Sequence, residues 1–172
     1  VQDPGPPTLI ALDCGAKASV GGPTLVEGLA RGMEAATGVP AEVLPSKRGF
    51  KGFNGSITKS AGQAQIPTPP GEFRVDIVPK DKATGYETPL LMGRPSMGTL
   101  GLVTDWENDR FLAPKIGMGA AISHPDGSVS VRGHWRPMAE HRGHAAIDMA
   151  QLPGRREQNE GNIFAVEREG LE

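Results

Sequence analysis

One carboxylate at the end of an apolar segment is the side chain of this chain best placed to do chemistry. Residues 9–12 (Leu-Ile-Ala-Leu) lead into Asp13, Cys14 and Gly15. Prolines precede the apolar segment, which has the length of a strand, and a glycine lets the chain turn sharply after it. The sequence therefore predicts a buried strand that presents Asp13 on a loop. Because Asp and Gly are also ordinary turn residues, this segment alone leaves a purely structural Asp13 open.

A second apolar strand is predicted at residues 89–93, and it also stops at a glycine. Pro95 suits the first turn of a short helix that ends at Gly101. Between the two apolar strands, an Asn-Gly pair favours a two-residue hairpin turn. That turn lies in a glycine-rich stretch made of Gly52, Phe53, Asn54, Gly55 and Ser56.

In chain order, the strand that ends at Asp13, the glycine-rich hairpin and the second apolar strand resemble the retroviral-type aspartic proteases, in particular the protease domains of Copia-like retrotransposon polyproteins. In that family a strand ends in Asp-Thr/Ser-Gly-Ala, a flap hairpin follows, and an apolar-apolar-Gly strand passes beside the active-site loop before a short helix. Asp13-Cys14-Gly15-Ala16 matches the first motif apart from Cys14, and Leu91-Met92-Gly93-Arg94 matches the second. The resemblance covers about residues 8–111 and is looser beyond them.

The resemblance implies a mostly β, retropepsin-like closed domain with one or two short helices, active as a symmetric homodimer. It makes Asp13 catalytic, with Cys14, Gly15 and Ala16 as the active-site loop. Residues 52–56 take the place of a flap over an extended polypeptide substrate, and Leu91, Met92, Gly93 and Arg94 form the supporting strand. The implied substrate is a polyprotein that contains this domain, and no cofactor or metal is expected.

Aspartic protease chemistry needs two carboxylates close enough to share one proton, so that one activates water while the other, protonated, polarises the scissile carbonyl. The chain has a single Asp-x-Gly at a strand end. Asp76, Asp105 and Asp148 are each followed by a large apolar residue, so none supplies a second copy. We therefore expect activity to require a homodimer in which Asp13 of each subunit meets the other across a two-fold axis.

Cys14 departs from the family pattern. The Thr or Ser of the family donates a hydroxyl hydrogen bond across the dimer axis, whereas a thiol is a weak donor. One alternative is thus a non-catalytic dimerisation or peptide-binding module of the same fold, and another is an unrelated small β domain in which Asp13 only caps a turn. A cysteine protease with Cys14 as nucleophile and a distant histidine as base is a third.

Charge and composition do not favour nucleic acid or a membrane as partner, and they indicate the compartment to expect. The formal net charge is −2 and the pI about 6.1, which does not favour nucleic acid or an anionic membrane surface. No apolar stretch is long enough for a membrane span, and residues 1–7 lack the regions of a signal peptide. A single cysteine excludes an internal disulfide framework, so a cytoplasmic or other reducing compartment is expected. The missing initiator methionine suggests a piece excised from a longer chain.

The three histidines within residues 134–144 share a helical face only if that segment is helical. Pro137 and Gly143 argue against a helix there, so solvated histidines are a simpler interpretation than a metal site.

Glycine (24 residues) and proline (16 residues) together approach a quarter of the chain, as is typical of a loop-rich β protein. We divide the chain into a linker (1–7), a protease core (8–113), an extension with a β-hairpin (114–152) and a polar tail (153–172). The sequence leaves open whether the extension folds onto the core. A helix with one apolar face is expected at 24–36, with a capping box at its start, and an edge strand interrupted by Pro40 at 39–44. In the strand expected at 71–79, apolar residues alternate with the polar side, which includes Asp76. Residues 144–152 fit either a strand or a short helix.

Overall fold

The structure is a computed structural model that describes residues 5–51 and 55–154, and it is mostly β, as the sequence predicts. Its main sheet has eight strands. In their order across the sheet these are β14 (Ala139–His141), β15 (His144–Asp148), β1 (Leu9–Leu12), β8 (Leu91–Met92), β2 (Val20–Gly21), β7 (Gly71–Ile77), β6 (Gln63–Thr68) and β3 (Glu42–Leu44). The expected closed sheet is not observed: this sheet is open, because β14 and β3 each pair on one side only.

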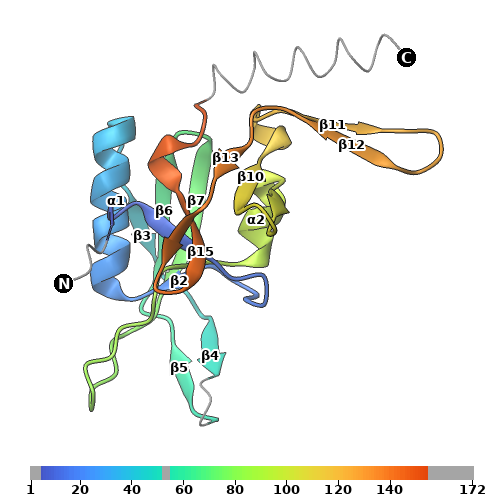
Figure 1. Ribbon diagram of the computed structural model, residues 1–172. Helices are drawn as coiled ribbons and strands as arrows, with labels where there is room; N and C mark the ends of the chain where they lie inside the picture. Colours follow the sequence, from blue (N-terminus) through green and yellow to red (C-terminus); the bar gives the residue numbers. More distant parts are fainter. Residues whose placement is uncertain (1–4, 52–54, 155–172) are drawn as a thin grey trace.

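Three smaller sheets complete the described strands. One consists of β13 (Arg136–Pro137), β10 (Arg110–Leu112) and β9 (Val103–Asp105). The hairpin of β11 (Ala120–Ser123) and β12 (Val129–Arg132) projects from the body at one end, and the hairpin of β4 (Gly49–Lys51) and β5 (Ile57–Lys59) projects at the other (Figure 1). Both hairpins lie where the sequence predicts them.

Helix α1 (Pro23–Thr37) packs against β6 and covers one face of the main sheet (Figure 1). Val26, Leu29 and Met33 recur at helical spacing and are buried, so they form the apolar side that the sequence predicts. Gly38 ends the helix with a left-handed φ of 74°, a conformation that glycine adopts without the steric cost of a Cβ.

The expected capping box at the start of α1 is wrong. The helix begins one residue earlier, at Pro23, after Gly22, and no side chain within the helix caps it. Instead, the Glu87 carboxylate accepts hydrogen bonds from the amides of Thr24 (2.7 Å) and Leu25 (3.1 Å). A distant acid therefore satisfies amides at the helix start that a local capping box would otherwise satisfy.

The region after Ala113 does fold onto the core. Strand β15 pairs antiparallel with β1, placing Ile10 opposite Ile147. It is followed by a short 3₁₀ helix, η2 (Met149–Gln151), so residues 144–152 form both of the elements that the sequence could not separate. Ile147 and Met149 are 1% exposed and join the same core as α1. Of the predicted tail, all but residues 153 and 154 lies outside the described residues.

Within the part of the chain that the structure describes, no helix is long and apolar enough to cross a membrane.

Candidate active site

The loop that carries Asp13 spans the end of an inserted strand. β8 pairs parallel with β1 on one side (Leu12 opposite Met92) and antiparallel with β2 on the other (Val20 opposite Leu91). Because residues 13–19 connect β1 to β2, they must pass around the end of β8. The two apolar strands that the sequence singled out are therefore neighbours, although about eighty residues separate them.

Several hydrogen bonds fasten this loop to the end of β8 and to the segment that follows it. Asp13 N donates to the carbonyl of Met92 (3.0 Å), and Arg94 N donates to the carbonyl of Ala16 (3.0 Å). The Arg94 side chain adds a bond from Nε to the carbonyl of Cys14 (3.2 Å). The structure thus joins the predicted active-site loop to the predicted supporting strand, backbone to backbone and through one guanidinium.

Gly93 is the point of closest approach between the two segments. It is buried, and a Cβ built on it would lie 2.5 Å from the carbonyl carbon of Ala18 and 2.9 Å from the nitrogen of Ser19. Real Cβ atoms do not approach backbone so closely, so only glycine fits unless the loop moves. The amide of Gly93 donates to Oγ of Ser19 (3.0 Å).

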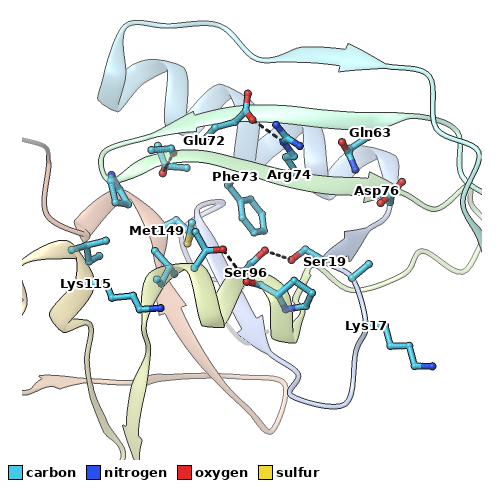
Figure 2. Close-up of a pocket in the computed structure, with 18 of the residues that line it drawn as sticks. Lys17, Ser19, Gln63, Glu72, Phe73, Arg74, Asp76, Ser96, Lys115 and Met149 are labelled. Carbon is cyan, nitrogen blue, oxygen red and sulfur yellow. Dashed lines mark hydrogen bonds and ion pairs between the residues drawn. The ribbon is translucent and has the colours of Figure 1, made fainter. Parts of the chain in front are cut away.

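Ser19 is a site residue that the sequence did not reveal. Its side chain is buried, and its hydroxyl also hydrogen-bonds with Ser96 of α2 (Arg94–Leu100) at 2.9 Å (Figure 2). It therefore ties the end of the loop to the start of that helix. A serine in a polar loop has no spacing or pattern that would distinguish it beforehand.

The Asp13 carboxylate is partly exposed, and Oδ1 accepts a hydrogen bond from the amide of Gly15 (3.0 Å). No cation of the described residues pairs with it. A Cβ at Gly15 would lie 3.3 Å from Oδ1, so a small residue suits that position. The carboxylate is oriented by the loop backbone and remains accessible to water or a substrate.

Cys14 is exposed, and within the described residues its thiol makes no hydrogen bond. Only its carbonyl takes part in the loop, through Arg94. No histidine of that part of the chain bonds to the thiol; His124, for example, bonds to Ser130 in the β11–β12 hairpin (2.6 Å). The geometry gives no partner that would activate Cys14 as a nucleophile.

Two of the other aspartates considered above, Asp105 and Asp148, have structural partners of their own. Asp105 binds Asn108 and Arg110, and these hydrogen bonds lower its pKa below the usual value. Asp148 accepts hydrogen bonds from Thr8 (2.6 Å) and from the amide of Ala150. Each of these carboxylates is therefore engaged away from Asp13.

Asp76 differs from its expected place. The alternation of Phe73, Val75 and Ile77 put Asp76 on the solvent side of β7, but the structure buries it to 2% exposure. A buried carboxylate requires hydrogen bonds or a countercharge, and Asp76 has both, from Ser46, Ser60 and Arg48.

The predicted flap is described in part. β4 and β5 pair as a hairpin, with Phe50 opposite Thr58. Gly52, Phe53 and Asn54 lie outside the described residues, whereas Gly55 and Ser56 are described and exposed. The hairpin forms a separate two-stranded sheet, and its base, through Ser46 and Ser60, is joined to the main sheet at β7.

A hollow of about 710 Å³ lies between β7, α2 and the 3₁₀ helix η1 (Pro114–Ile116). Figure 2 shows Phe73 pointing from β7 toward the Ser19 and Ser96 pair, with Lys17 and Lys115 at the edges. Asp13 does not line this hollow. The Asp13 carboxylate instead lies outside this hollow, on the loop that connects β1 to β2.

No group of three or more His, Cys, Asp or Glu side chains among the described residues could hold a metal ion. The segment that would have to be helical to gather the histidines contains strands β13 and β14.

Comparison of the chain with protein-family models, with curated proteins and with solved structures found no match. The class of this protein is therefore inferred from its own residues and their geometry.

Proposed function

We propose that the chain is an aspartic endopeptidase of the retropepsin-like kind, active as a homodimer. The observation that carries the proposal is the arrangement of β8 between β1 and β2, with Asp13 on the loop around its end. Gly93 and Arg94 hold that loop so that the carboxylate is oriented and accessible. This is the relation between the Asp-x-Gly loop and the apolar-Gly strand that the family resemblance implies.

The chemistry follows from bringing two copies of this loop together. Two Asp13 carboxylates a few ångströms apart hold one proton between them, because two adjacent charges repel. The ionised carboxylate removes a proton from water as the water attacks the scissile carbonyl, and the protonated one donates its proton to the carbonyl oxygen, which gives a tetrahedral diol. The first carboxyl then donates the proton to the amide nitrogen while the second takes one from the diol, the C–N bond breaks, and an acid and an amine leave. Cleavage is therefore expected to have an acidic optimum.

The proposed substrate is an extended polypeptide that pairs as an added strand, and a polyprotein containing this domain is the natural candidate. Among the described strands β5 pairs only with β4, and its residue Ile57 is 73% exposed, which suits contact with such a strand. The test is cleavage of a peptide library at mildly acidic pH, in the presence and absence of a transition-state-mimicking aspartic protease inhibitor.

A second candidate function is a non-catalytic dimerisation or peptide-binding module of the same fold. The exposed thiol of Cys14 favours it, because no hydroxyl is present to brace two loops across a dimer axis. Dimerisation without cleavage, unchanged by Asp13→Asn, would identify this module.

Replacing Cys14 with threonine is expected to tighten the dimer. Two hydroxyl hydrogen bonds across the axis, at about 1 kcal/mol each, correspond to a dissociation constant lower by roughly thirtyfold. Sedimentation equilibrium measures this change, and the cleavage rate at low protein concentration should rise with it. Cys14→Ala is the control, since it removes the thiol without adding a hydroxyl. A Thr variant that dimerises no better than the Ala variant would contradict the proposed brace.

A further inference from the structure

Asp76 is a buried carboxylate that the proposed chemistry does not use. It lies in β7 and is 2% exposed. Oδ1 accepts a hydrogen bond from the hydroxyl of Ser46 (2.7 Å). It also lies 3.1 Å from the hydroxyl of Ser60, whose one proton is shared with the carbonyl of Gly62 (2.8 Å). Oδ2 lies 3.5 Å from Nε of Arg48. Isolating a carboxylate from water is costly, and these contacts are what offset that cost.

The three partners of Asp76 flank one element, the β4–β5 hairpin. Ser46 and Arg48 precede β4, and Ser60 follows β5. The amide of Ser60 also donates to the carbonyl of Arg48 (2.9 Å), which closes the base of the hairpin. Both legs of the hairpin therefore converge on one carboxylate of the main sheet.

Asp76 also contacts the segment that leaves the Asp13 loop. Its amide donates to the carbonyl of Ser19 (3.0 Å), and the hydroxyl of Ser19 accepts from the amide of Gly93 (3.0 Å). Asp76 and Ser19 thus connect the hairpin base to the glycine around which the Asp13 loop is built. Figure 2 shows both residues at the same end of the hollow between β7 and α2.

We infer that Asp76 is a positioning residue, which fixes the direction of the β4–β5 hairpin relative to the Asp13 loop. The amide of Asp76 is hydrogen-bonded to Ser19, and its side chain contacts the residues at both ends of the hairpin. The hairpin and the Asp13 loop are therefore attached to the same residue. A peptide that binds along the hairpin is then held at a constant position relative to the Asp13 carboxylate. The effect on peptide binding rests on the proposed function, whereas the fixing of the hairpin does not.

A buried carboxylate at this position is not needed simply to stabilise the fold. Apolar residues could fill the same space at lower cost, because a buried ion pair rarely stabilises a fold better than good packing. What a carboxylate adds is directional hydrogen bonding with two hydroxyls, together with a charge contact to Arg48. The inference therefore predicts a local effect on the hairpin when the bonds are removed.

The test compares hydrogen–deuterium exchange of Ser46→Ala, Ser60→Ala and Asp76→Ala with that of the unmodified chain. Amides of the hairpin (residues 49–51 and 57–59) are expected to exchange about fivefold faster, as for the loss of one hydrogen bond, while those of α1 are unchanged. Asp105→Ala is the matched control, since that carboxylate also binds an arginine but in another sheet. The serine variants carry the test if Asp76→Ala fails to fold.

A kinetic arm addresses the role in peptide binding. Ser46→Ala should raise KM severalfold with kcat changed by less than about twofold, because Asp13 and its loop are untouched. Unchanged exchange in the hairpin would overturn the inference, and so would equal acceleration in the hairpin and α1. Faster hairpin exchange in a protein that cleaves no peptide would support the anchoring by Asp76 and refute the proposed hydrolase.

Discussion

Asp13→Asn is expected to reduce peptide cleavage by at least about 100-fold, because an amide cannot exchange the proton that the reaction requires. The substitution is nearly isosteric, and the asparagine oxygen can still accept the hydrogen bond from Gly15, so the loop and the dimer should persist. Measured as kcat/KM on a cleaved peptide, the loss should fall on kcat.

Asp109→Asn is the control for this substitution. Asp109 is exposed and has a φ of 49°, a conformation that asparagine tolerates well. Its cleavage rate and melting temperature should match those of the unmodified chain. If Asp13→Asn cleaves peptide as fast as Asp109→Asn, then Asp13 has no catalytic role.

Gly93→Ala is expected to lower the free energy of unfolding by roughly 1–3 kcal/mol, as overpacking does in a tight interior, and to abolish cleavage. The added Cβ would meet backbone atoms of Ala18 and Ser19, which cannot rotate away as a side chain could. Relief of the contact must therefore displace the loop that carries Asp13. Denaturant unfolding and the peptide assay measure the two effects.

Gly98→Ala is the matched comparison for Gly93→Ala. Gly98 lies in α2, five residues further on, and a Cβ there would meet nothing within 4 Å. Alanine in a helix is favoured over glycine by about 1 kcal/mol, so this variant should be slightly more stable and equally active. Equal stability of the two variants would show that Gly93 is not the tight contact that the structure indicates.

The elements that present the candidate site could be predicted from the sequence because their signals are local. Apolar runs that stop at Gly15 and Gly93 mark the two strands, and Pro95 and Gly101 mark α2, whose bounds are Arg94–Leu100. The insertion of β8 between β1 and β2 could not be predicted from the residues alone. It depends on pairing between segments far apart in the chain, which no local pattern specifies.

The misplaced details have the same physical origin. Glu87 satisfies the start of α1 from across 63 residues, and no local capping motif reveals such a partner. Alternation along β7 put Asp76 in solvent, but hydroxyls of Ser46 and Ser60 make its burial possible. Hydrophobic periodicity along the sequence does not indicate which polar residues are buried by tertiary hydrogen bonds.

The central claim is that two Asp13 loops meet across a two-fold axis, and Cys14 allows it to be measured directly. Cys14 is the single cysteine of the chain, is exposed and adjoins Asp13, so a short bis-maleimide can link two subunits only through this position. A covalent dimer is expected in high yield when the reagent is added under native conditions, and no cross-link when it is added in denaturant. A dimer in sedimentation that fails to cross-link, or a chain that stays monomeric at high concentration, would contradict it.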